Sequence, residues 1–154
     1  MELKTKIDAK DGTQELLITR EFDLPVELLF KAYTEPELIE QWMGTKVLKM
    51  ENKKFGSYQF ETVQNGHVVF SASGTIHRFI ANQKIIRTFE MENMPLGVQL
   101  EFLEFKSLTD NTSKLSIQVI YQSVAHREQQ LKMPFAQGLN YAHNRLQEII
   151  HTLK

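Results

Sequence analysis

The spacing at which apolar residues recur changes once along the chain, and this change limits the fold more than any other feature. Between residues 45 and 122, apolar and polar residues alternate in short runs separated by turn residues, which is typical of strands. From Pro134 to Thr152 apolar residues recur every three or four positions, which predicts one amphipathic helix about 28 Å long. The strands must therefore bury one face of their sheet against a single long helix.

Six strands are expected in the alternating region. Asn65-Gly66 is the strongest hairpin signal, because both residues tolerate the left-handed conformation that a two-residue turn requires. The other turns are also short, so consecutive strands should pair antiparallel. The predicted strands cover residues 45–51, 57–64, 67–80, 84–92, 98–106 and 114–122.

One more strand and two short helices should precede them. Residues 15–23 alternate and predict the strand, and Pro25 suits the first turn of a helix that runs to Tyr33. Residues 1–14 are polar and should form a lead-in strand or a tail, and residues 125–132 should form a separate short turn.

The second short helix should cover residues 35–43. Thr34 and Glu37 have the spacing of a capping box, in which each side chain bonds to the backbone near the other. Gly44 follows where a glycine commonly ends a helix. The order strand, helix, helix, six strands, helix predicts an α+β fold, with a curved seven-stranded antiparallel sheet around the C-terminal helix.

The composition indicates one domain over residues 1–154 and excludes several classes of function. Hydrophobic residues make up 42% of the chain, which is enough for a core without cross-links. The sequence has no cysteine, so disulfides, thiolate catalysis and cysteine-ligated zinc are excluded. The 18 basic and 19 acidic residues argue against a nucleic-acid-binding protein.

Neither a leader nor a metal centre is predicted. The N-terminus lacks the apolar core of a signal peptide, and no stretch approaches the roughly 18 apolar residues of a membrane span. We therefore expect a cytoplasmic protein. His143 and His151 are two helical turns apart, too far for a helical zinc site, and we predict neither a metal nor a cofactor.

A bent sheet that touches one helix mainly at its ends leaves space between them, which is a candidate ligand site. The small residues Ala72 and Gly74 lie among large ones on the predicted inner face, where a missing side chain either leaves a hollow or lets another element approach. The alternative is that these apolar residues are packed core. The alternation predicts a pocket lined by Tyr58, Phe60, Phe70, Ile76, Phe89, Leu100 and Phe102.

Arg78 continues this inner-face alternation, and a buried guanidinium needs a partner. Three alternatives are open: Arg78 pairs with Glu104, it pairs with an anionic ligand, or a bulge turns it outward. Trp42 is either a packing anchor or a ligand contact.

His143 flanks the apolar stripe of the last helix. It either faces the pocket, as a general base or hydrogen-bond donor, or lies at the helix edge with one nitrogen in water. We include both Arg78 and His143 among the candidate ligand-binding residues, and we assign no catalytic residue.

Three segments near the start of the chain match the opening signature of one bacterial family: Ile18–Pro25, Phe30–Glu37 and Gln41–Gly44. Weaker matches follow at Phe55–Tyr58, Ser73–Ile76, Gly138-Leu139 and Leu146. From about residue 15 to the end, the sequence thus resembles the bacterial domains that are similar to the C-terminal domain of the activator of heat-shock protein 90 ATPase. These domains belong to the START-like superfamily, together with lipid-transfer domains, polyketide cyclases and the birch-pollen allergen. The resemblance implies a helix-grip fold with an internal cavity.

The sequence departs from the family pattern at several positions. Leu139 replaces a usual tryptophan, Phe55-Gly56 a common Gly-Gly, His143 a leucine and Arg78 a frequent glutamate. These changes fall where a pocket would be lined, so the resemblance implies the fold and not the ligand. The domain alone lacks the extra N-terminal region with which eukaryotic co-chaperones engage their chaperone, so the resemblance does not favour that role.

The leading hypothesis is non-catalytic binding of a small apolar or amphipathic molecule between the sheet and the C-terminal helix. One alternative is an enzyme of the cyclase or aromatase kind, which would use Arg78, His143 and Tyr58. The other is a co-chaperone-like interaction module. A binder predicts a mostly apolar pocket with one or two polar groups, an enzyme predicts convergent polar groups, and a module predicts a filled core with an exposed apolar patch. The identity of the ligand and a homodimer stay open.

Overall fold

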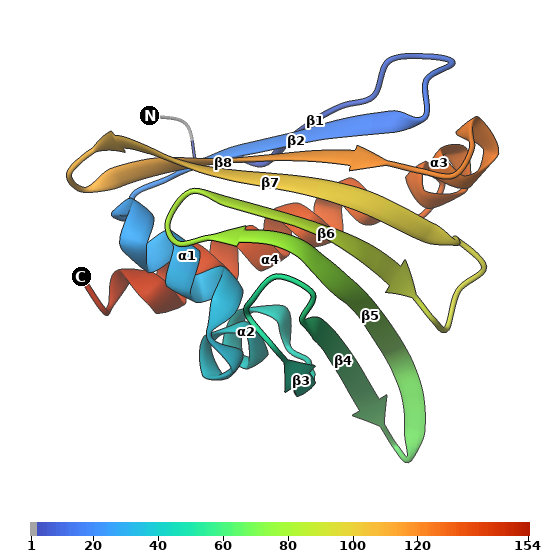
Figure 1. Cartoon of the computed structure of the whole chain (residues 1–154), viewed down its shortest axis with the longest axis horizontal. Coiled ribbons are helices and arrows are strands. Elements are labelled where there is room, and N and C mark those ends of the chain that lie inside the picture. The colour runs from blue at the N-terminus through green and yellow to red at the C-terminus, as the bar shows by residue number, and fades with distance from the viewer. Residues whose placement is uncertain (1–2) are drawn as a thin grey trace.

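An eight-stranded antiparallel sheet curves around helix α4 in the computed structural model, which describes residues 3–154 (Figure 1). The order across the sheet is β1-β2-β8-β7-β6-β5-β4-β3. The strands are β1 (Lys6–Asp8), β2 (Glu15–Phe22), β3 (Lys46–Met50), β4 (Ser57–Gln64), β5 (His67–Ile80), β6 (Lys84–Met91), β7 (Val98–Thr109) and β8 (Thr112–Ile120). The helices are α1 (Val26–Thr34), α2 (Pro36–Met43), α3 (Val124–Leu131) and α4 (Phe135–His151).

The predicted α+β helix-grip fold is confirmed, with one strand and one helix more than the basic order. β1 pairs with β2, with Ile7 opposite Ile18, so the lead-in strand extends the sheet. The expected turn at residues 125–132 is helix α3, which begins where the Ser123 side chain accepts from the backbone N–H of His126.

The predicted capping box at Thr34 is wrong. Thr34 is the last residue of α1, and its hydroxyl donates back to the carbonyl of Phe30 at 2.8 Å. Glu35 takes the N-cap position of α2 without a side-chain bond, and Pro36 is the first helical residue. The proline has no N–H to satisfy there, so α2 begins without a capping hydroxyl.

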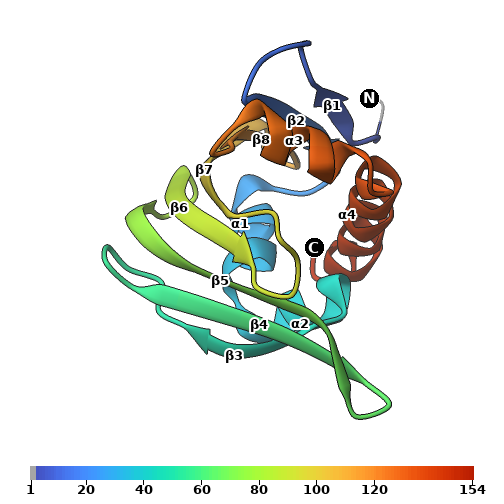
Figure 2. The same cartoon turned by 90° about the vertical axis from the view of Figure 1, so that its right-hand side faces the viewer.

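The sheet wraps around α4, while α1 and α2 lie beside this helix at one end of the sheet (Figure 2). The predicted helical stripe is present: Leu146 and Ile150 are fully buried and Ile149 is half-buried. These residues belong to the C-terminal half of α4, and this half packs into the hydrophobic core.

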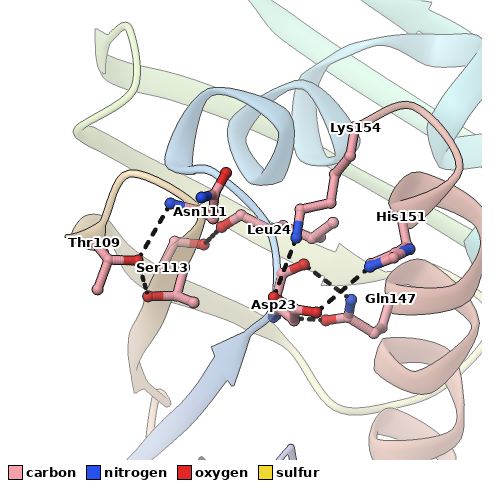
Figure 3. Close-up of polar contacts among 9 residues, drawn as sticks. Asp23, Leu24, Thr109, Asn111, Ser113, Gln147, His151 and Lys154 are labelled. Atoms are coloured by element: carbon pink, nitrogen blue, oxygen red, sulfur yellow. Dashed lines mark hydrogen bonds and ion pairs between the residues drawn. The ribbon is translucent and has the colours of Figure 1, made fainter.

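Polar contacts fasten the C-terminal half of α4 to Asp23, the first residue after β2 (Figure 3). The Gln147 side chain accepts from the backbone N–H of Asp23 at 2.9 Å and donates to its carbonyl at 3.3 Å. The Asp23 carboxylate accepts from Lys154 at 3.1 Å and lies 3.4 Å from His151. The bond from Lys154 is the main cause that lowers the pKa of Asp23. The C-terminal end of α4 is thus fixed by packing and by these bonds.

Candidate ligand-binding pocket

A pocket of about 490 Å³ lies between the sheet and the N-terminal half of α4. Its wall also includes residues of α1, α2, α3 and the turn between α3 and α4. Pro134 and Gly138 belong to the wall and are exposed, so the pocket opens to solvent beside the start of α4. Its size is within the range of small-molecule sites.

Most of the wall is apolar. Phe60, Phe70 and Phe89, which the alternation places on the inner face, lie on it, one from each of β4, β5 and β6. Leu139 and Ala142 face them from α4. The wall therefore offers mainly aromatic and aliphatic surface to a bound molecule.

Gly138 leaves a gap in the pocket-facing side of α4. Apart from its chain neighbours and the nearby backbone of α4, a Cβ atom built on this residue would have no atom within 4 Å, so no close packing requires a glycine there. Within a helix, glycine is less favourable than alanine by roughly 0.5–1 kcal/mol. Helix stability thus does not explain this residue, and its effect is to widen the pocket.

Arg87, Glu101 and Gln99 form the polar end of the pocket. Arg87 on β6 lies directly opposite Glu101 on β7, and its Nε donates to the carboxylate at 2.9 Å. The Gln99 amide donates to the other carboxylate oxygen at 3.0 Å. Both charged side chains are only 11% exposed.

The Arg87 guanidinium also lies over the Tyr58 ring, 4.9 Å from its centroid, which is cation–π geometry. Burial acts to lower the pKa of Arg87. The interactions with Tyr58 and Glu101 outweigh this effect and raise the pKa above its ordinary value. The guanidinium therefore stays charged at the pocket wall.

The other polar wall residues already have protein partners. The Tyr33 hydroxyl lies 2.8 Å from Nε2 of His143, and the Trp42 indole donates to a backbone carbonyl of α1 at 2.7 Å. The Gln130 amide oxygen accepts from the Tyr121 hydroxyl at 3.0 Å. Trp42 is thus both a packing anchor and part of the wall.

Tyr58 and Ile76 are buried as predicted but are not part of the wall. Tyr58 lies opposite Gly74 across the β4–β5 pair, and its hydroxyl donates to the carbonyl of Thr88 at 2.5 Å. A Cβ on Gly74 would come within 2.5 Å of that hydroxyl. The missing side chain of Gly74 therefore lets the tyrosine approach and does not enlarge the pocket under α4, and Ala72 is likewise buried outside the wall.

The inner-face prediction is wrong for Leu100 and Phe102. β7 turns Gln99, Glu101, Leu103 and Phe105 inward. Leu100 and Phe102 therefore lie on the opposite face and are half-buried. The alternation in the sequence favoured the apolar residues Leu100 and Phe102 for the inner face. The fold instead buries Gln99 and Glu101 there, and Glu101 accepts a hydrogen bond from Arg87.

Arg78 does not reach the pocket. The β5–β6 register shifts between Ile76 and Arg78, so the bulge turns the arginine outward and leaves it exposed. This outcome is the third of the three alternatives. Glu104 is exposed as well and lies 3.9 Å from Lys84.

His143 is fully buried but is not a wall residue. Its Nδ1 lies 2.7 Å from the Thr5 hydroxyl, while Nε2 contacts Tyr33. Burial, aided by the charge of Arg20, lowers the pKa of His143 to about 3, so the ring is neutral. Both nitrogens are occupied, and His143 is therefore neither a water-exposed edge residue nor a ligand contact.

The sequence reading missed the polar end of the pocket. Arg87 and Glu101 carry opposite charges at positions that face each other across the β6–β7 hairpin. The hairpin register was the signal that could have paired them, because directly opposed charges on one sheet face stabilise each other.

Among residues 3–154, no group of three or more histidine, cysteine or acidic side chains could hold a metal ion. Within the same range, no helix is long and apolar enough to cross a membrane.

Solved structures of bacterial proteins share the fold. Protein Ms6760 from Mycobacterium smegmatis is 20% identical, with 95% of this chain and 96% of that one covered, at a TM-score of 0.82. A Rhodobacter sphaeroides protein is 19% identical, with 97% and 99% covered, at a TM-score of 0.85. DynU16, from the dynemicin biosynthetic locus, is 12% identical, with 92% and 48% covered, at a TM-score of 0.70. At these identities the likeness concerns the fold alone.

No curated protein matches the sequence significantly. One family model does, and it matches residues 23–151, from the end of β2 to the end of α4. This range contains nearly the whole pocket wall, including its polar end. The chain therefore belongs to the family described as Activator of Hsp90 ATPase homolog 1-like protein.

Proposed function

We propose that this protein binds a small, largely apolar or amphipathic molecule under α4 and does not transform it. The observation that carries the proposal is the pocket of about 490 Å³, whose wall is mostly aromatic and aliphatic with one polar cluster. Small-molecule sites typically combine such a wall with a few polar groups that orient the ligand. The cytoplasmic location stays a prediction, and the oligomeric state stays open.

A cyclase-like enzyme is the first alternative, and it requires a titratable group that can exchange protons with a bound substrate. Tyr33, Arg87 and Glu101 are the ionisable residues of the wall. Burial raises the pKa of Tyr33 well above its usual value, and the hydroxyl is already bonded to His143. Among residues 3–154, no histidine lies on the wall, and Arg87 and Glu101 are bonded to each other. The one observation that supports an enzyme is that DynU16, which has a similar fold, comes from a biosynthetic locus.

An interaction module is the second alternative, and one observation favours it. The β4–β5 hairpin exposes Val63, Val68 and Val69, each about half accessible to solvent. The open pocket favours small-molecule binding, because a protein-interaction module is expected to have a filled core.

Native mass spectrometry of freshly purified protein tests the proposal. We expect part of the sample to carry additional small-molecule mass that denaturation releases. The variant Gly138→Leu, purified in the same way, should carry less, because its side chain enters the pocket. Equal adducts on both proteins would place the molecule elsewhere and contradict the proposal.

A further inference from the structure

We propose that the pocket selects uncharged molecules that carry a hydrogen-bond acceptor, such as a ketone or amide carbonyl, and discriminates against carboxylates. This inference rests on the proposed binding function and concerns the chemistry of the ligand. It follows from the donors that Arg87 leaves unused and from the charge that Glu101 already supplies.

Arg87 has donors to spare. A guanidinium has five N–H groups, and the only hydrogen bond that the structure records for Arg87 with residues 3–154 comes from Nε. Four N–H groups on the two terminal nitrogens therefore have no hydrogen-bond partner among residues 3–154, and Arg87 is part of the pocket wall. The contact with the Tyr58 ring and the bond to Glu101 hold the guanidinium in one orientation, so these donors are preorganised.

The counter-charge of Arg87 is also in place. Both oxygens of Glu101 are engaged, one by Arg87 and one by Gln99, which holds the carboxylate against the guanidinium. No other wall residue carries a charge at neutral pH. Arg20 is buried too, but it is not a wall residue, and it bonds to Thr5 and Asn140.

A ligand carboxylate would therefore add a net negative charge to an otherwise neutral, largely apolar pocket. An uncompensated buried charge is far more costly than a buried neutral acceptor that receives a hydrogen bond. A carbonyl oxygen can accept from the free guanidinium donors without this cost. The pair thus acts as a neutral donor site.

Two ligands with the same alkyl chain test this selectivity. Methyl nonyl ketone and decanoate are titrated against bound N-phenylnaphthylamine, an uncharged fluorescent probe, at about pH 8, where a free carboxyl group is ionised. The ketone should displace the probe at a concentration about tenfold lower than decanoate does. In Glu101→Gln the guanidinium loses its counter-charge, so the preference should move toward decanoate by about tenfold or more.

The double variant Arg87→Met/Glu101→Met guards against a folding defect, because it removes both charges and leaves none unpaired. It should bind the probe, while its affinity for the ketone falls several-fold below that of the wild type, because the guanidinium donors are gone, and decanoate gains no preference. Probe binding with decanoate equal to or better than the ketone in the wild type would overturn this inference and leave the binding function standing. Failure of the probe and both ligands to bind the wild type would overturn both.

Discussion

The Tyr33 hydroxyl lies 2.8 Å from Nε2 of His143, so a hydrogen bond inside the core joins α1 to α4. The Thr5 hydroxyl lies 2.7 Å from the other ring nitrogen. A neutral imidazole accepts at one nitrogen and donates at the other, which suits these two hydroxyl partners. Protonation would place a charge in the core next to the cation Arg20.

This arrangement predicts a pH dependence of stability. The pKa of His143 is lowered to about 3 in the folded protein, against about 6.5 in an unfolded chain. The unfolded state therefore binds the proton first as the pH falls. The stabilising contribution of neutral His143 is complete above about pH 6.5 and is lost progressively toward about pH 3, at up to about 1.4 kcal/mol per pH unit.

Urea unfolding at a series of pH values measures this loss. The variant His143→Gln keeps hydrogen-bonding groups but cannot titrate, so its stability should fall less steeply between about pH 6 and pH 4. Carboxylates such as Asp23 contribute equally to both proteins, so the difference isolates the histidine. Parallel curves for the two proteins would show that His143 does not titrate in this way.

The contact of Tyr58 with Thr88 predicts a second effect on stability. Tyr58→Phe keeps the ring but leaves the carbonyl of Thr88 without its 2.5 Å partner, at a cost of about 1–3 kcal/mol. Gly74→Ala should cost at least as much, because the new Cβ would lie 2.0 Å from that carbonyl oxygen. Chemical denaturation of both variants measures these costs, and a Gly74→Ala protein as stable as the wild type would refute the close contact.

Leu146 anchors the buried half of α4 and is fully inaccessible to solvent. Leu146→Ala should lower the free energy of unfolding by about 2–5 kcal/mol, the usual range for a core leucine. Leu153→Ala is the matched control, because Leu153 lies just beyond α4 and is 52% exposed, and it should change stability by less than about 0.5 kcal/mol. Similar losses in the two variants would contradict the assigned core.

The fold could be predicted from the sequence because its signals are local. The alternating runs, the Asn65-Gly66 turn and the single helical stripe each act over a few neighbouring residues. Pocket residues such as Phe60 and Phe89 follow directly from the same alternation.

The polar end of the pocket could not be predicted in this way, because it depends on pairing between strands. The burial of Gln99 and Glu101 becomes favourable only when Arg87 lies opposite, and the hairpin register decides that. The outward turn of Arg78 likewise depends on one extra residue in β5, which shifts all later side chains to the other face. The buried position of His143 could not be predicted either, because its hydrogen-bond partner Thr5 lies more than a hundred residues away in the sequence.

Binding of N-phenylnaphthylamine to Gly138→Leu tests the central claim most directly. Leucine is a better helix former than glycine, and a Cβ at this position would lie within 4 Å of no atom outside its own stretch of α4, so the variant should fold at least as stably as the wild type. Gln137→Leu is the matched control, because it adds the same side chain at the neighbouring exposed position, which is not part of the wall. If the pocket under α4 is the binding site, the wild type and Gln137→Leu bind the probe alike, while Gly138→Leu binds it at least about tenfold more weakly. Unchanged probe affinity in a folded Gly138→Leu protein would show that the pocket is not the site.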